Sequence, residues 1–414
     1  MNSNTLRIGI DVGSVRHRVA VGLPDGTLID EFDVDHHTAG FNQFFDRIAA
    51  LEVRHPLPVT VATESYNGWA RPFDGLIRQH GWTLYNVNNL KLARYKEIFP
   101  APAKTDAIDA RRILQLFQLS AHIPVARDAL QEVAATPAVN DTLKRLTRRR
   151  KQLVNERVRI VNRIQADLHA VCPELLALTG DVTNVWFLNF LTCRDALQKL
   201  AKLQHRSVLA IPAIGQKYAA QIQTWQRTAC FAPDVDIVSE MILQDARRIQ
   251  ALGMDIKVLD RSIKATAADS ALARTLQSIP GFGDTTTAEL AGEIGTLSRF
   301  ESEAGLALYA GMAALDNSSG KKTGARTPRQ VNTRAKAAMM VAIARHLPHV
   351  PASRAYYDKK RAEGKIHNQA IRALGRQMIR VIWGAGQTRT GIRNSSKKYL
   401  KILAGCSGLA LTHH

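Results

Sequence analysis

The stretch IGIDVG, residues 8–13, decides how the N-terminal part of the chain folds. It lies in an apolar, β-branched run over residues 6–23, which the turn LPDG at 23–26 separates from a second alternating run at 27–34. These patterns predict three strands joined as an antiparallel meander. Asp11 then lies late on the first strand, among small neighbours.

Helix and strand patterns alternate after this meander. The predicted elements are a helix at 40–51, a strand at 59–63, a helix at 69–79 that stops at Gly81, a strand at 83–87 and a helix at 106–119. The order βββαβαβα is that of a ribonuclease H-like fold, and right-handed βαβ connections permit it. We therefore predict an α/β catalytic domain over residues 1–125.

The character of the sequence changes after this domain. Residues 141–171 are long-helical and strongly basic, and a second helical stretch at 237–268 suits an antiparallel partner. We predict a helical, coiled-coil middle over residues 137–270, with a solvated helical linker as the alternative. Further helical patterns predict a mainly α C-terminal domain over 271–390, followed by a basic tail at 391–414.

The charge balance points to a polyanionic partner. The chain has 56 Lys and Arg against 36 Asp and Glu, a formal net charge of +20, which favours nucleic acid over a membrane surface. The four cysteines show no metal-binding spacing and are expected as reduced thiols. We expect a cytoplasmic protein without a membrane partner, because no apolar run approaches the ~20 residues that span a bilayer.

Four acidic residues form the candidate active site. Asp11 ends the first strand, and Glu64 follows the strand that should lie beside it. Asp106 and Asp109, spaced by three, share one face of a helix, where their charges repel unless a cation lies between them. Carboxylate oxygens suit Mg²⁺, and four acids are enough for two ions that polarise a scissile phosphate. Considered alone, Asp106 is more simply interpreted as a helix cap and Asp109 as a solvated acid.

A second candidate site is the loop NSSGKKTG, residues 317–324. Six basic residues and no acid occur between Lys321 and Lys336. A serine hydroxyl in this loop suits attack on a DNA phosphate, given a base or metal to take its proton. Taken without further context, a flexible Ser/Gly loop on a basic surface is the favoured interpretation.

The chain resembles the DEDD transposases of insertion sequences, the family that includes the pilin-gene invertase and the RNA-guided bridge recombinases. The matching motifs are the Asp11 strand region, TES at 63–65, KTDAIDAR at 104–111, IPGFG at 279–283, LYAGM at 308–312 and SG at 319–320. Two departures are SY after Glu64 and TPRQV at 327–331, where the family has Ile-x-x-x-Gly.

The resemblance implies a RuvC-like N-terminal domain, a coiled coil and a C-terminal transposase domain. It further implies that the serine before the glycine, here Ser319 with Ser318 as the fallback, forms a covalent phosphoserine with DNA. Mg²⁺ held by the four acids assists, and strand exchange passes through a Holliday-type junction. The resemblance also implies a non-coding guide RNA that pairs with donor and target DNA, and assembly as a dimer of dimers.

Basic residues near these motifs are the candidate nucleic-acid contacts. They are Lys104, Arg148, Arg149, Arg150, Lys321, Lys322 and Arg326. The alternative function is a hydrolytic RuvC-like junction nuclease in which water attacks and no covalent intermediate forms. An actin-like kinase would also explain residues 8–13, but it needs a second phosphate loop and an adenosine motif, and neither is found in the sequence. An architectural nucleic-acid-binding protein explains the charge and leaves the paired Asp106 and Asp109 unexplained.

Overall fold

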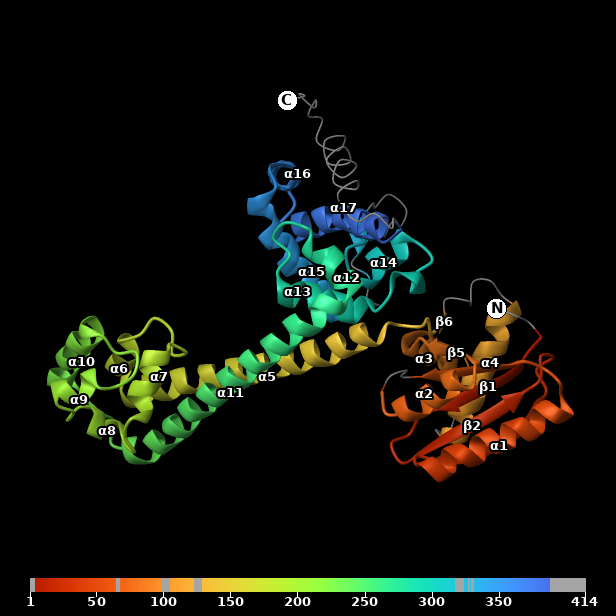
Figure 1. Cartoon of the computed structure of the whole chain (residues 1–414), viewed down its shortest axis with the longest axis horizontal. Coiled ribbons are helices and arrows are strands. Elements are labelled where there is room, and N and C mark those ends of the chain that lie inside the picture. Colours follow the sequence, from red (N-terminus) through yellow and green to blue (C-terminus); the bar gives the residue numbers. More distant parts are fainter. Residues whose placement is uncertain are drawn as a thin grey trace. The chain divides into compact units, whose positions relative to one another are not determined.

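The computed structural model describes residues 4–64, 68–98, 105–122, 129–316, 324–326, 328 and 331–387. The chain divides into two compact units, residues 1–135 and 136–414. Their helices and strands are labelled in Figure 1, and each unit has its own hydrophobic cores. Among the helices that the structure describes, none combines the length and apolar composition needed to cross a bilayer.

A six-stranded sheet in the order β3-β2-β1-β4-β5-β6 forms the first unit. Its strands are β1 (Leu6–Asp11), β2 (Arg16–Gly22), β3 (Leu28–Asp35), β4 (Val59–Glu64), β5 (Thr83–Val87) and β6 (Leu130–Glu132). The predicted antiparallel meander of the first three strands is confirmed, and β4 and β5 continue the sheet in parallel with β1. The antiparallel edge strand β6 was not predicted from the sequence.

Helices cover both faces of this sheet (Figure 1). They are α1 (Thr38–Arg54), α2 (Arg71–Gln79), α3 (Asn89–Glu97) and α4 (Asp106–His122). Because side chains alternate along a strand, Ile8 and Ile10 of β1 point into the core with α1 and α2. The opposite face packs against α4 and α3, where Ile113 and Phe117 join side chains of β4 and β5.

Strand β1 and helix α4 approach each other closely at Gly9. A Cβ atom added there would lie 2.7 Å from the Leu114 backbone nitrogen and 2.8 Å from the Ala110 carbonyl oxygen. Ala20 of β2 completes this small-residue contact with Ala110 and Leu114. Since the obstructing atoms are backbone atoms, only glycine allows α4 to lie so near to β1.

A long helical hairpin organises the second unit. Helix α5 (Ala138–Val171) runs antiparallel to α11 (Val235–Asp269), so the predicted hairpin is confirmed (Figure 1). Ion pairs connect the two helices along their length. These pairs are Arg150–Asp260, Glu156–Arg248 and Arg163–Asp245.

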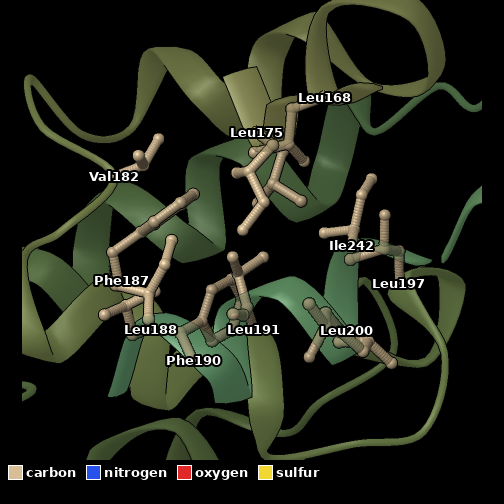
Figure 2. Packing of buried hydrophobic residues seen from close by; sticks show 14 of the residues in the cluster. Leu168, Leu175, Val182, Phe187, Leu188, Phe190, Leu191, Leu197, Leu200 and Ile242 are labelled. Carbon is tan, nitrogen blue, oxygen red and sulfur yellow. The ribbon is translucent and has the colours of Figure 1, made fainter. Parts of the chain in front are cut away.

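Short helices at one end of the hairpin enclose a compact core, which the sequence patterns left unresolved. They are α6 (Pro173–Ala177), α7 (Val185–Thr192), α8 (Leu197–Leu200), α9 (His205–Leu209) and α10 (Gln216–Thr228). Figure 2 shows Phe187, Phe190 and Leu191 packed with Leu168 and Ile242 from the two long helices. All five side chains are fully buried.

The other end of the hairpin joins the C-terminal core. This core includes α12 (Ala271–Gln277), α13 (Asp284–Ile294), α14 (Glu303–Tyr309), α15 (Thr333–His346), α16 (Pro351–Ala362) and α17 (His367–Gln387), with η2 (Leu297–Arg299), η3 (Leu347–His349), β7 (Leu315–Asp316) and β8 (Ala325–Arg326). The turn before α13 needs Gly281, which has φ +83° and lies against the backbone of Arg345 and His346. The His346 ring approaches the Pro280 carbonyl oxygen at 2.7 Å, so this tight turn packs on α15.

We expect the substitution Gly9→Val to destabilise the first unit by about 2–3 kcal/mol, because the new side chain must push α4 away from β1. Gly75→Ala in α2 is the matched control. Nothing lies within 4 Å of its added Cβ, and replacing a helical glycine should stabilise by about 0.5–1 kcal/mol. Urea denaturation measures the free energy of unfolding of each variant. Hydrogen exchange of peptides from β1 and α4 then shows whether Gly9→Val loosens this contact. Equal protection of these peptides in wild type and Gly9→Val would contradict the prediction.

Candidate active site

Asp11 and Glu64 lie at the ends of neighbouring parallel strands. Strand β1 pairs with β4 through Ile10 and Thr63, and each acid is the next residue in its strand. Parallel strands present their carboxyl ends at the same edge of the sheet. The side chains of Asp11 and Glu64 share a hydrogen bond. Two carboxyl groups form such a bond only when one of them carries a proton.

Helix α4 contributes the other two acids. Thr105 caps this helix, because its hydroxyl oxygen accepts a hydrogen bond from the Ile108 backbone nitrogen at 3.3 Å. Asp109 is buried, with 8% of its surface exposed, and acts electrostatically on Asp11. Asp106 lies exposed in the first turn, three positions earlier. The structure thus brings Asp11, Glu64 and Asp109 together and leaves Asp106 at the exposed start of the same helix.

Arg111 ties the first turns of α4 to the sheet. Its guanidinium donates two hydrogen bonds to the carboxylate of Glu31 on β3. Arg18 pairs with Asp11 in the β1–β2 register, but its guanidinium reaches Asp33 at 3.1 Å. The two arginines therefore pair with acids of β3, away from the carboxylate cluster.

Crowding of the three carboxyl groups changes the protonation of Asp11. The pKa of Asp11 is raised to about 7, first by burial and then by the hydrogen bond and negative charge of Glu64 and the charge of Asp109. Lys96 lowers the pKa of Asp11 and opposes the rise. The cluster therefore holds more negative charge than its surroundings compensate near neutral pH.

Lys96 is a residue of this site that the motifs did not identify. It lies in α3, and its Nζ atom is 2.9 Å from Oδ1 of Asp109. The side chains of Lys96 and Asp109 are 30% and 12% exposed, so the ion pair is largely screened from water. Helix α3 begins after Asn88, whose side chain accepts hydrogen bonds from Leu90 and Lys91, and this cap is the one sequence feature that could have revealed the helix.

The donor chemistry of the cluster fits a hard divalent cation. In the part of the chain that the structure describes, no three His, Cys, Asp or Glu side chains lie close enough to form a ready-made metal site. Asp11, Glu64 and Asp109 nevertheless offer carboxylate oxygens in one electrostatic cluster, where Asp11 is protonated at a pH far above its usual range. A divalent cation would remove this repulsion, because it prefers such oxygens and takes the place of the proton.

Several predicted residues of the nucleic-acid site lie outside the described residues. These are Lys104, Ser318, Ser319, Lys321 and Lys322, together with the side chain of Arg326. The structure places the flanking segments, in which β7 pairs antiparallel with β8 through Leu315–Arg326 and Asp316–Ala325.

The arginine triplet at 148–150 has mixed surroundings. The Arg148 guanidinium donates to both carboxylate oxygens of Glu293, at 2.7 and 2.8 Å, and Arg150 pairs with Asp260. Arg149 is exposed. Two of the three predicted contacts thus already have a carboxylate partner within the second unit.

Glu293 centres a buried polar network that sequence reasoning missed. Its side chain is fully buried, and although burial raises its pKa, hydrogen bonds from Arg148 and Asn332 lower the pKa below the ordinary value. Asn332 donates to Glu293 at 2.8 Å and to the Tyr309 hydroxyl at 2.6 Å. The Asn332 side-chain oxygen accepts from the Arg334 and Ala335 nitrogens and so caps α15. The network fixes the start of α15 against α5 and α13.

Comparisons with known proteins match most of the chain. Residues 8–173 match a family of DEDD transposases of the IS110 type. Residues 273–358 match the transposase family IS116/IS110/IS902. The 43.6 kDa protein of insertion element IS110 from Streptomyces coelicolor is 27% identical over 91% of this chain and 92% of that protein. The 44.8 kDa protein of IS116 from Streptomyces clavuligerus is 28% identical over 91% and 93%. The mini-circle putative transposase for IS117 from S. coelicolor is 26% identical over 94% and 95%.

The raised pKa of Asp11 predicts a pH-dependent stability in the absence of metal. The folded state keeps a proton on Asp11 up to a pKa of about 7, whereas the unfolded chain releases it near the ordinary aspartate pKa of 3.8. This contribution to stability is complete below the unfolded pKa and is lost as the pH rises through 7. In chelator, the free energy of unfolding of wild type should therefore fall more steeply than that of Asp11→Asn between about pH 5 and about pH 8.

Asp25→Asn provides the control for this titration. Asp25 is exposed in a turn, and the hydrogen bond from the Thr27 nitrogen lowers the pKa of its carboxyl group. Its substitution should leave the slope of stability against pH unchanged in this interval. Parallel pH profiles for wild type and Asp11→Asn would show that Asp11 is not protonated in the folded state.

Proposed function

This chain belongs to the IS110/IS116 family of transposases, and we propose that it cuts and rejoins DNA strands at a divalent-metal centre built on Asp11, Glu64, Asp106 and Asp109. A transposase acts on DNA, so the proposal concerns which residues and which chemistry it uses. The observation that carries it is the convergence of Asp11 and Glu64, at the adjoining ends of β1 and β4, with the buried Asp109 of α4. Carboxyl groups crowded in this way repel one another and lower stability, and a bound cation would offset this repulsion.

The fold that supports this centre is proposed to be ribonuclease H-like. The strand order β3-β2-β1-β4-β5, with an antiparallel meander followed by two parallel strands, favours this assignment. The acids then come from the first strand, from the strand beside it and from the helix that crosses the first strand. We propose Mg²⁺, two ions for each centre, as the metal, and when bound it would polarise the scissile phosphate.

The chain's own groups perform the remaining work of this site. Asp11 and Glu64 provide two carboxylates at the adjoining strand ends, and Asp109 provides a third carboxylate from α4. Lys96 neutralises part of their charge through Asp109. Because Asp109 is buried and Asp11 and Glu64 are half-buried, the electrostatic interactions among these three acids are stronger than they would be in open water.

Ser319 is proposed as the nucleophile, by its match to the SG motif of the family. Its Oγ would form a bond to the scissile phosphorus while the bond from phosphorus to the leaving deoxyribose oxygen breaks. The serine gives up its proton, and the leaving oxygen takes one up. Attack by a strand-end hydroxyl on the phosphoserine reverses these steps and releases the serine. Donor and target DNA would exchange strands in this way.

The further partners are proposed from the same family resemblance. They are a non-coding guide RNA that pairs with donor and target DNA, and other copies of the chain in a dimer of dimers. The net charge of +20 supports an extensive nucleic-acid surface. The residues Lys104, Arg149, Lys321, Lys322 and Arg326 remain proposed contacts of that surface, with Arg148 and Arg150 placed beside Glu293 and Asp260.

We expect Asp11→Asn and Asp109→Asn each to reduce DNA cleavage by at least about 100-fold, because each removes a carboxylate that would hold the metal. Asp46→Asn on α1 is the matched control, since Asp46 is exposed on a helix packed against the other face of the sheet. A gel assay with DNA carrying the ends of the insertion element, with and without Mg²⁺, measures cleavage. Full activity of Asp11→Asn would exclude the acidic centre.

A covalent intermediate distinguishes the serine mechanism from hydrolysis. Wild type denatured during reaction with labelled DNA should yield a protein–DNA adduct, and Ser319→Ala should abolish it while Ser318→Ala retains it. An adduct lost only in Ser318→Ala would move the nucleophile by one residue. Cleavage by wild type without any adduct would establish the water-dependent nuclease instead.

A further inference from the structure

We propose that the pocket between α16 and α17 binds a backbone phosphate of the DNA strand on which the enzyme acts; this inference rests on the proposed function. The pocket has a volume of about 490 Å³. Its lining comes from the segment at 312–314, from α16 and the turn after it, and from α17, and it includes Met312, Tyr356, Lys360, Lys365, Arg372 and Arg376.

The charge of this pocket is strongly one-sided. Four of its lining residues are cationic, and none is acidic. Glu363 is shared between Lys360 at 2.8 Å and Lys365 at 3.1 Å. Glu303 approaches Arg376 at 2.6 Å and Arg380 at 3.3 Å. Among the described residues, the four cations of the lining and Arg380 lie near two carboxylates, and this net positive charge attracts an anion.

Arg376 also has a buried donor without an acceptor. Its Nη1 atom is inaccessible to solvent and has no hydrogen-bond partner among the described residues, while Nη2 engages Glu303. A buried guanidinium donor left without an acceptor costs free energy. The Arg376 side chain is still 27% exposed, and a phosphate oxygen that approaches this exposed part meets a fixed positive charge held in place by Glu303.

The floor of the pocket is apolar. Met312 and Tyr356 are 3% and 6% exposed, and the ring of Tyr356 lies 5.4 Å below Nζ of Lys360. Helix α17 packs directly against Met312 at Gly375, where an added Cβ would lie 2.4 Å from the Met312 sulfur. Apolar walls lower the local dielectric, which strengthens the attraction between the cations and a bound phosphate.

The position of the pocket in the chain favours the reacting DNA strand as its ligand. Ala314 in the wall directly precedes β7, and the segment from β7 to β8 carries Ser319. Five residues of fully extended chain span at most about 18 Å. A strand whose phosphate occupies the pocket therefore lies within a few nucleotides of the proposed nucleophile.

The double variant Lys360→Gln/Arg372→Gln tests this proposal against Arg354→Gln/Lys359→Gln. Both pairs remove two charges, and the control pair lies on α16 outside the pocket lining. Fluorescence anisotropy of the full chain with labelled single-stranded DNA, and separately with RNA of the same sequence, measures affinity over a series of salt concentrations. The assay contains chelator, so it reports binding whether or not the acidic centre cleaves DNA.

We expect the pocket pair to weaken DNA binding by about tenfold and to reduce the slope of log Kd against log salt by about 0.7 for each lost phosphate contact. The control pair should change both quantities clearly less. Equal effects of the two pairs, or a loss confined to RNA, would overturn the proposal. Failure of cleavage in wild type, with this difference in binding retained, would refute the proposed function and leave the phosphate site intact.

Discussion

The contact of Gly9 with the backbone of α4 is the constraint on which the first unit depends. Because the strand carries no side chain there, the helix lies against it at a distance that a Cβ would prevent. Gly9 and Asp11 point to the same face of β1, and Ala110 directly follows Asp109. The packing that admits the helix therefore also places Asp109 beside Asp11 of the strand. A steric property of one residue determines an electrostatic property of another.

The acidic cluster combines groups that a protein would otherwise keep apart. Three carboxyl groups share it, and burial together with their repulsion raises the pKa of Asp11 to about 7, while Lys96 pairs with Asp109. The proton on Asp11 and the charge of Lys96 supply positive charge at places where a divalent cation would supply more. The second unit uses the opposite solution, since its buried Glu293 is fully paired with Arg148 and Asn332 and serves the packing of α15.

Much of the fold followed from periodicity, because the meander, the helix from Asp106 and the long hairpin have extended apolar patterns. Strand β6 has only three residues, too few to show an alternation. Lys96 and Glu293 were not predicted for another reason. Their roles depend on ion pairs with Asp109 and Arg148, residues separated from them in sequence. Without knowledge of these partners, a charged residue is expected to lie in solvent. The spacing of Asp106 and Asp109 suggested equal roles, whereas only Asp109 is buried.

The hairpin of α5 and α11 belongs to two hydrophobic cores at once. Leu143 of α5 lies in the C-terminal core, whereas Leu153 and Ile164 of the same helix lie in the core of the short helices. An α-helix of 34 residues is about 51 Å long and cannot shorten without losing hydrogen bonds. Melting of either core therefore frays the helices that hold the other, so the two should lose their structure as one cooperative unit. Their separation in space does not make them thermodynamically independent.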